Sequence, residues 1–186
     1  MKLHVPPADV AIAPVTVQDF AMLRELAGAI WRQHYTGIIS AAQIEHMLAG
    51  RFTDAALREH LQATDRWLEL LRVSGAPVGY CACELTALSR DGDGSGGGPP
   101  AMKLGQLYVL ESHRGTGLGR FMLGHVERRA RNLGRGTLWL QVNKRNPGAI
   151  SFYKAAGFTI AREAVFDIGS GFVMDDYIME KRLGAE

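Results

Sequence analysis

The chain reads Ser112-His113-Arg114-Gly115-Thr116-Gly117-Leu118-Gly119-Arg120 between a strand-like run, 103–110, and a helix-like run, 118–133. Three glycines within five positions let a ligand approach the backbone closely, because glycine carries no Cβ. A helix that begins inside this turn directs its unpaired N–H groups and the positive end of its dipole toward the same place. Arg114 and Arg120 add positive charge on either side. These features predict a phosphate-binding turn.

The glycine spacing separates this turn from two common phosphate-binding motifs. A P-loop needs Lys and then Ser or Thr after its last glycine, whereas here Gly119 is followed by Arg120. A dinucleotide-binding fingerprint needs G-x-G-x-x-G early in a βαβ unit, and this turn lies late in the chain with another spacing. The pattern that is present is Arg114-x-x-Gly117-x-Gly119.

A second motif follows the turn. After the helix-like run come a strand-like run, 137–142, and a stretch that opens on Asn146 and carries Tyr153. Two motifs in this order are much more specific than one glycine turn. Together they closely resemble the acetyl-coenzyme A-binding motifs of the GCN5-related N-acetyltransferases (GNAT), and the strongest match covers residues 106–158.

The resemblance implies a donor site built largely from backbone groups. Amides of the glycine turn would hold the pyrophosphate of coenzyme A, and main-chain groups near Val109 and Leu110 would pair with the pantetheine arm and polarise the thioester carbonyl. Asn146 has the local pattern of a helix N-cap, and in the family this residue also contacts the pantetheine arm. The cofactor-binding residues implied in this way are Val109, Leu110, Arg114, Gly115, Thr116, Gly117, Leu118, Gly119, Arg120, Asn146 and Tyr153.

The resemblance nominates Tyr153 as the general acid. It follows Asn146 by about two helical turns, so both share a helix face, and a phenol can protonate a leaving thiolate. Packing of the ring against the sheet is the alternative. Many family members carry the base as a Glu in the fourth strand, where this chain has Gln106, which cannot act as a base. Glu84 and Glu111 are candidate substitutes, and a water chain to solvent is a third option.

The acceptor is indicated only by short segments. Residues 31–35 follow the first predicted helix, where family members shape the acceptor pocket. In the last strand, either Asp175 or Asp176 must point to the same side as Val173 and Met179. A carboxylate within an apolar strand needs a partner, which could be a structural Arg or an incoming cationic amine. Together these segments also resemble the spermidine/spermine-acetylating branch of the family.

The sequence therefore predicts an acetyl-CoA-dependent N-acetyltransferase. By resemblance, a primary amine would attack acetyl-CoA directly in a ternary complex, and the acceptor would be a small molecule such as a polyamine. One alternative is the same chemistry on a protein or peptide. Another is a non-catalytic coenzyme A-binding sensor module, which the missing Glu keeps open.

The order of elements predicts a mixed α/β fold. Short strands and amphipathic helices alternate, and the resemblance implies a mostly antiparallel, twisted central sheet of about seven strands, with four to five helices and splayed fourth and fifth strands. The whole chain, 1–186, is predicted to be one domain, with 91–100 as a flexible glycine-rich loop. The predicted strands are 10–15, 67–73, 78–85, 103–110, 137–142, 158–166 and 172–181, and the predicted helices are 19–32, 41–48, a third from Thr53, 118–133 and a last one after Asn146.

Composition narrows the class further. The formal net charge of +2 gives no reason to expect a nucleic-acid partner. Cys81 and Cys83 lie two apart in a strand-like run, which favours buried free thiols over a disulfide, and no metal site is expected because the histidines are scattered. No run of residues has the ~20 apolar positions that cross a bilayer. The sequence predicts a cytoplasmic protein without a membrane partner, and leaves a homodimer open.

Overall fold

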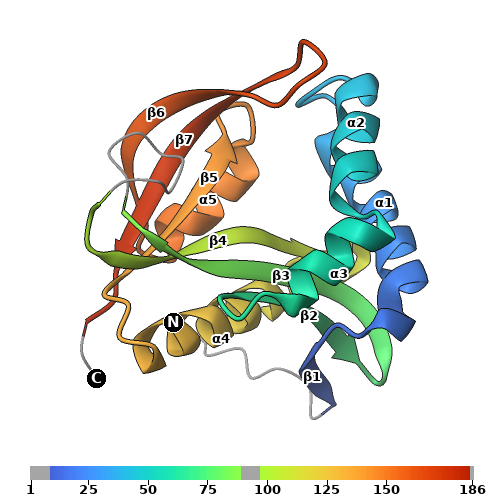
Figure 1. Ribbon diagram of the computed structural model, residues 1–186, viewed down its shortest axis with the longest axis horizontal. Coiled ribbons are helices and arrows are strands. Elements are labelled where there is room, and N and C mark those ends of the chain that lie inside the picture. Colours follow the sequence, from blue (N-terminus) through green and yellow to red (C-terminus); the bar gives the residue numbers. More distant parts are fainter. Residues whose placement is uncertain (1–8, 89–96, 185–186) are drawn as a thin grey trace. The chain divides into compact units, whose positions relative to one another are not determined.

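The computed structural model describes residues 9–88 and 97–184, and Figure 1 labels their helices and strands. The elements in chain order are β1 (Val10–Pro14), α1 (Phe20–Tyr35), α2 (Ala41–Arg51), α3 (Asp54–Gln62), β2 (Arg66–Val73), β3 (Ala76–Ala87), β4 (Pro100–Val109), α4 (Leu118–Asn132), β5 (Thr137–Asn143), α5 (Pro147–Ala155), β6 (Thr159–Asp167) and β7 (Val173–Arg182). Two short 3₁₀ turns, Val17–Asp19 and Glu111–His113, precede α1 and the glycine turn.

The strands form one sheet in the order β1-β2-β3-β4-β5-β7-β6. β1 pairs antiparallel with β2, and β7 pairs antiparallel with both β5 and β6, whereas β4 and β5 are parallel. The parallel register covers only Met102–Leu104 against Leu138–Leu140, although β4 continues to Val109 and β5 to Asn143. The mixed, mostly antiparallel fold is therefore confirmed, and the short parallel register is what splayed strands require.

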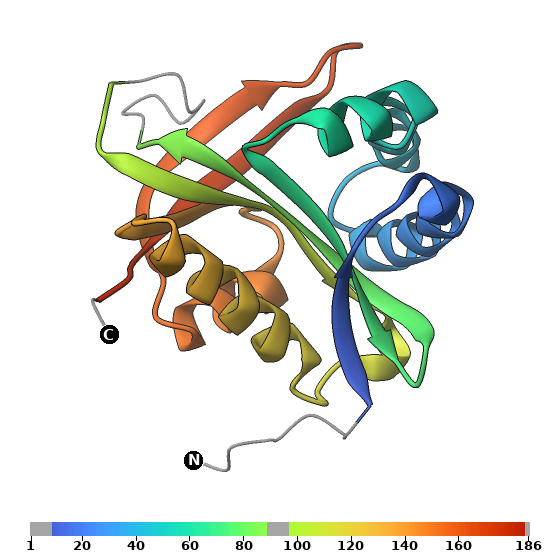
Figure 2. The ribbon, with the colours of Figure 1, turned by 60° about the horizontal axis from the view of Figure 1, so that its bottom comes forward.

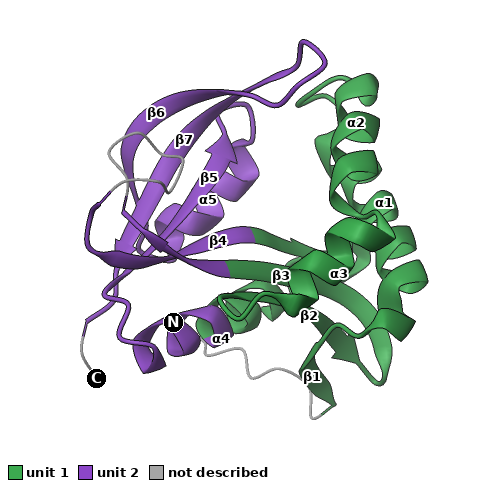
Figure 3. Ribbon diagram, in the orientation of Figure 1, with its two compact units in different colours: residues 1–83, 106–124 green, residues 84–105, 125–186 purple. Residues whose placement is uncertain are grey.

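The chain divides into two compact units, coloured separately in Figure 3. Unit 1 comprises the described residues up to Cys83 together with Gln106–Gly124, and unit 2 comprises those of 84–105 and 125–186. The prediction of a single domain over 1–186 stays a prediction. Of the predicted loop 91–100, residues 91–96 lie outside the described part, and Pro100 is already the first residue of β4.

In unit 1, α1–α3 lie on the same face of β1–β3 (Figure 2). The predicted helical spacing is realised in α1, where Leu23, Ala27, Ile30 and Trp31 are all buried. Two predicted caps are also present. The Ser40 hydroxyl accepts a bond from the backbone N–H of Gln43 at 3.1 Å and begins α2, and Thr53 does the same for α3.

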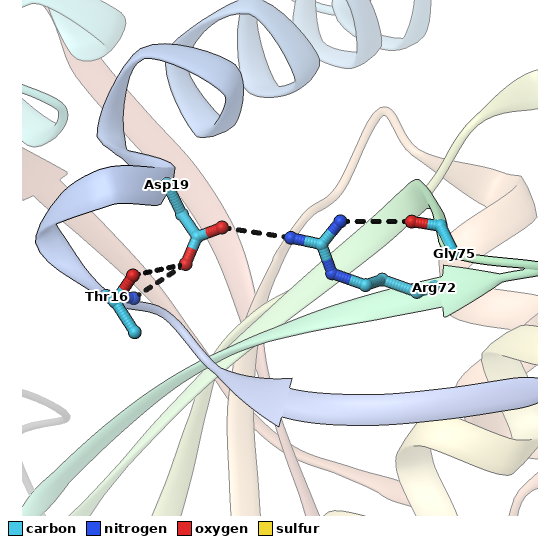
Figure 4. A network of polar contacts seen from close by, with 4 residues as sticks. All are labelled: Thr16, Asp19, Arg72 and Gly75. Atoms are coloured by element: carbon cyan, nitrogen blue, oxygen red, sulfur yellow. Dashed lines mark hydrogen bonds and ion pairs between the residues drawn. The ribbon is translucent and has the colours of Figure 1, made fainter.

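A polar network fixes the start of α1 to the β2–β3 hairpin (Figure 4). Thr16 donates from its backbone N–H (2.9 Å) and its hydroxyl (2.8 Å) to the Asp19 carboxylate, which also accepts from Arg72 at 2.9 Å. Arg72 donates in turn to the carbonyl of Gly75 at 3.1 Å. Burial raises the pKa of Asp19, but the bonds from Thr16 and the charge of Arg72 outweigh it and leave that pKa lowered. Ser74 and Gly75 have φ of 49° and 80°, as a two-residue hairpin turn requires.

In unit 2, α5 and residues 125–132 of α4 lie on one face of β5, β7 and β6 (Figure 2). Lys181 of β7 reaches Glu127 of α4 on this face, with Nζ and Oε1 2.6 Å apart. Ala101, Trp139 and Ile178 form a buried apolar cluster in the same unit. Because Ile178 has the opposite parity to Lys181, this cluster lies on the face away from α4 and α5.

Several predicted boundaries were displaced. α1 runs to Tyr35 instead of Arg32, because the Tyr35 ring packs beside Trp31 and the helix-breaking Gly37 (φ 85°) comes only two residues later. α2 continues beyond Leu48 to Arg51, and β4 begins three residues before Lys103.

The end of α4 and the two cysteines also agree with the sequence. α4 stops at Asn132, ahead of Gly134, whose φ of 68° suits a helix terminator. Cys81 and Cys83 are both buried and free, as predicted. Among residues 9–88 and 97–184, none of the helices is long and apolar enough to span a membrane.

Candidate active site

The glycine turn of unit 1 has the backbone geometry that its sequence predicts. Gly115 and Gly117 have φ of 76° and 89°, in the region that favours glycine. The Thr116 hydroxyl donates to the carbonyl of His113 at 2.6 Å and fixes the turn from within. α4 begins at Leu118, and the amide of Phe121 donates to the carbonyl of Gly117 at 3.0 Å. The amides of the first turn therefore have no acceptor inside the helix and suit an anionic group such as a pyrophosphate.

At the end of β4, the two residues predicted to contact the pantetheine arm, Val109 and Leu110, differ in whether their backbone N–H can reach a ligand. The amide of Leu110 donates to the carbonyl of Val78 in β3 at 2.8 Å, so it is not available to a ligand. Backbone groups of a strand alternate in direction, so the N–H of Val109 points to the β4 edge opposite β3. Val109 is thus the better placed of the two. A Cβ at Gly79 would lie 2.4 Å from the Tyr108 carbonyl oxygen, so β4 leaves no room for a side chain at this position of β3.

Two polar contacts join the end of α1 to the segment around the glycine turn. Gln33 donates to the carboxylate of Glu111, and Arg114 lies 3.3 Å from Nδ1 of His34. Burial and the charge of Arg114 lower the pKa of His34. The Glu111 side chain is exposed and bonded to an amide, which does not favour it as a base. The predicted acceptor segment 31–35 lies within the last turns of α1 and does not follow the helix.

A cluster of aromatic rings in unit 1 was not predicted. Trp31 donates from Nε1 to the hydroxyl of Tyr80 at 2.7 Å, and the hydroxyls of Tyr35 and Tyr108 are 2.8 Å apart. Burial raises the pKa of both Tyr80 and Tyr108 well above the ordinary value. The rings of Tyr80 and Tyr108, on neighbouring strands, lie 5.3 Å apart. The cluster forms because β3 lies beside β4 and α1 packs on both strands, so no local sequence signal could have found it.

Asn146 begins α5, as predicted. Its Oδ1 accepts from the amide of Ala149 at 3.2 Å, and its own amide donates to the carbonyl of Asn143 at 2.9 Å. Tyr153 is largely buried, and its ring lies 5.1 Å from that of Phe152 and 5.5 Å from that of Phe158. These contacts support a packing role for the ring, and a role as acid stays a prediction.

Glu84 of β3 belongs to unit 2 and lies near a cation. Its Oε1 is 3.8 Å from Nζ of Lys103, which stands 5.0 Å from the centre of the Trp139 ring. Trp139 donates from Nε1 to the Thr86 hydroxyl at 2.9 Å.

The two aspartates of β7 lie on opposite sides of the strand. The buried carboxylate is Asp176, on the face of Met174 and Ile178, whereas Asp175 and Val173 are exposed. Asp175 bonds to Lys144 at 2.5 Å, and Lys144 also contacts Glu163. Asp175 therefore points to the same side as Val173, as one of the two aspartates had to, and the buried carboxylate lies on the other side of the strand.

Asp176 is the most unusual polar residue of unit 2. Its side chain is hydrogen-bonded to Asn143, but Oδ1 has no partner within the part of the chain that the structure describes. Burial, with a smaller contribution from Asp175, raises its pKa to about 6. No Arg pairs with it among the described residues, so the structural partner considered from the sequence is not found.

The predicted site residues fall into two sets. Unit 1 brings together Val109, Leu110, Glu111 and the glycine turn, and unit 2 holds Glu84, Asn146 and Tyr153. Within the described ranges, no three His, Cys, Asp or Glu side chains gather in a way that could hold a metal ion.

Comparison with known proteins identifies the family. Residues 24–158 match the model of the acetyltransferase (GNAT) family. An uncharacterised N-acetyltransferase of Mycobacterium tuberculosis is 28% identical over 162 residues, which cover 86% of this chain and 96% of that protein.

Solved structures share the fold. The PaiA N-acetyltransferase of Thermoplasma acidophilum, in complex with coenzyme A, gives a TM-score of 0.73 at 20% identity and covers 93% of this chain and 98% of its own. Arabidopsis thaliana Naa50, in complex with the bisubstrate analogue CoA-Ac-MVNAL, gives 0.63 at 21% identity, with 94% and 99% covered. With its glycine turn at the head of α4 and its short parallel β4–β5 register, this chain belongs to the GNAT family and is an acetyl-CoA-dependent N-acetyltransferase.

Proposed function

We propose that this enzyme transfers the acetyl group of acetyl-CoA to the primary amine of a small molecule, with polyamines as the first class of acceptor to test. The glycine turn supports the binding of acetyl-CoA, because Gly115 and Gly117 adopt positive φ directly before the amides at the start of α4. Acidic groups on one face of unit 2 support the acceptor half, since Glu84 and Asp176 would attract a cationic amine.

One relative supports a small acceptor. The streptothricin acetyltransferase of Streptomyces lavendulae is 42% identical over 52 residues, 28% of this chain. The resemblance of the segments 31–35 and 172–179 to the spermidine/spermine-acetylating branch points in the same direction.

The proposed roles of the protein groups follow from their chemistry. Acetyl-CoA supplies the activated acetyl group when bound. The amides at the start of α4 would hold the pyrophosphate, and the Val109 N–H would donate to the thioester carbonyl oxygen, where negative charge develops in the transition state. Asn146 would contact the pantetheine arm, and Tyr153 would donate a proton to the leaving thiolate.

The deciding experiment follows thiol release from acetyl-CoA in the presence of polyamines, amino acids, aminoglycosides and peptides. The proposal predicts turnover with small primary amines and little with peptides. Preferred turnover of peptides would replace it with a protein acetyltransferase. Coenzyme A binding without turnover on any amine would instead favour a sensor module.

The role of Tyr153 has its own test. Tyr153→Phe should lower turnover about 10-fold or more and leave acetyl-CoA affinity nearly unchanged, because only the hydroxyl is lost. Tyr177→Phe is the matched control, since Tyr177 lies in the same unit beside Lys144. Unchanged turnover in Tyr153→Phe would leave the ring with a packing role only.

A further inference from the structure

Asp176 lies in the middle of a sheet face that has no covering helix within unit 2. It is paired in register with Asn143 of β5 on one side and with Ala164 of β6 on the other. Among the described residues of unit 2, the helices α4 and α5 lie on the opposite face (Figure 2). The same face as Asp176 carries Trp139, whose indole bonds to Thr86 next to Glu84 and Lys103. Polar side chains from β3, β4, β5 and β7 therefore occupy one side of the sheet.

The surroundings of Asp176 leave its charge without a partner. Only 5% of its surface is exposed, and Oδ1 makes no hydrogen bond to any described residue. The nearby cations are engaged elsewhere, because Lys144 contacts Asp175 and Glu163, and Lys103 lies beside Glu84. Buried carboxylates are normally paired, so a buried oxygen left without a partner indicates a function or a missing ligand.

We propose that Asp176 is the carboxylate that receives the ammonium group of the acceptor and removes its proton, an inference that rests on the proposed function. The Asn143 amide holds the carboxylate in place from one side, and Oδ1 remains as the oxygen that meets the acceptor. Sequence reasoning left this role open between Glu84 and Glu111, both of which have a polar partner in the structure.

The step balances as follows. One N–H bond of the ammonium group breaks, its proton passes to Oδ1, and the nitrogen keeps the electron pair. That pair forms the new C–N bond with the acetyl carbon as the C–S bond breaks, and the thiolate takes up a proton. Of the two protons that the nitrogen loses, one makes up for the proton that Tyr153 gives to the thiolate and the other is released to solvent, which yields the amide, the free thiol and one proton.

The electrostatics of the site suit a base. A carboxyl group with a pKa near 6 is about 100-fold more basic than one with the ordinary value of 3.8, yet it is still mostly ionised at neutral pH. The charged groups that act on it are Asp175, Lys144 and Lys103. Asp175 raises the pKa and the two lysines lower it, so burial is the main cause of the shift.

The enclosure of Oδ1 also bears on which amines can reach it. Because this oxygen is shielded from water, an ammonium group reaches it only if neighbouring side chains withdraw. A thin, unbranched primary amine needs the smallest displacement. The structure therefore favours unbranched amines over amines branched at the carbon that bears nitrogen.

The test compares Asp176→Asn with Asp175→Asn, a matched control on the opposite face of the same strand. Asp176→Asn should lower kcat/KM for spermidine and n-butylamine by about 100-fold or more, with unchanged acetyl-CoA affinity by calorimetry. In the wild type, kcat/KM should fall as the pH drops through about 6, and this acidic limb should be missing in Asp176→Asn. Asp175→Asn should keep turnover and retain an acidic limb, shifted to lower pH because the charge of Asp175 no longer raises the pKa of Asp176. The wild type should turn over n-butylamine better than tert-butylamine.

A direct readout separates this inference from the proposed function. Carbon-13 NMR of the wild-type carboxyl groups, assigned with Asp176→Asn, should show Asp176 titrating near pH 6 and shifting when n-butylamine is added. Turnover of amines with no effect of the amine on Asp176, or with full activity in Asp176→Asn, overturns the inference and leaves the proposed function standing. If adding the amine shifts the Asp176 carbon-13 signal but no amine is turned over, Asp176 binds ammonium groups and the proposed function is wrong.

Discussion

Replacing Asp176 with Asn should change the stability of the protein in a pH-dependent way. The carboxyl is almost fully buried, and its pKa is raised from 3.8 to about 6. A raised pKa in the folded state means that folding favours the protonated form. This stabilising contribution is complete below pH 3.8 and is lost as the pH rises through about 6.

The magnitude follows from the shift. At 1.36 kcal/mol per pKa unit, the ionised carboxylate costs the folded state about 3 kcal/mol above pH 7, and about half of that at pH 5. Asn cannot titrate, so the variant escapes this cost. Its NH₂ group is newly buried and offsets the gain by about 1–3 kcal/mol at every pH. The stability of the variant relative to the wild type should therefore improve by about 1.4 kcal/mol between pH 5 and pH 7.5.

Urea denaturation of both proteins at pH 5, 6, 7 and 7.5, without coenzyme A, measures this difference. The control is Asp175→Asn, which removes an exposed carboxylate bonded to Lys144 and leaves Asp176 buried, so its gain with pH should be smaller than that of Asp176→Asn. A difference between Asp176→Asn and the wild type that stays constant with pH would refute the reasoning. It would mean that the Asp176 carboxylate is solvated or paired in solution, and the proposed ammonium site would lose its physical basis.

Three further outcomes are expected from other parts of the structure. Gly117→Ala should weaken acetyl-CoA binding about 5-fold or more in calorimetry, because a φ of 89° is unfavourable for Ala by about 1 kcal/mol or more. The control is Gly50→Ala in α2, where there is open space around the residue; this variant should bind acetyl-CoA normally. Arg114→Gln should raise the pKa of the His34 imidazole, measured by proton NMR, because the repulsion from Arg114 is removed while burial remains. An unchanged pKa of His34 would show that the two side chains do not interact in solution. Asp19→Asn should lower the free energy of unfolding by about 1 kcal/mol at pH 7. The difference from the wild type should narrow as the pH falls through the lowered pKa of Asp19. A difference in the free energy of unfolding that persists in acid would point to packing instead of charge.

The sequence was sufficient where structure is determined by local chemistry. Three helices begin where the sequence predicts, at Ser40, Thr53 and Asn146. The side chain of each accepts a hydrogen bond from the backbone N–H three residues further on, which is a local interaction. The glycine turn was likewise predictable, since its positive φ angles demand glycine. The family resemblance then supplied the mixed, mostly antiparallel sheet, and the structure adds that β4 and β5 are its parallel pair.

Features that depend on strand pairing were not predictable. Apolar residues of β7 occur at both parities, with Val173 and Met179 on one side and Met174 and Ile178 on the other, so the sequence could not show which aspartate is buried. Main-chain groups near Val109 and Leu110 were predicted to pair with the pantetheine arm, and the Leu110 amide is bonded to Val78 of β3. In each case the outcome depends on a neighbouring strand, whose register local patterns do not reveal.

The contact at Gly79 determines how far β3 can slide against β4. Backbone hydrogen bonds alone would tolerate a shift of two residues, because the bonding pattern of an antiparallel pair repeats at that interval. The position facing the Tyr108 carbonyl has no room even for a Cβ, and a shifted strand would place Cys81 or Pro77 there in place of Gly79. Because Gly79 has no side chain, only the observed register of β3 against β4 avoids a clash at this position. The close approach at Gly79 therefore fixes which residues of β3 lie beside Tyr108 and Val109 at the end of β4.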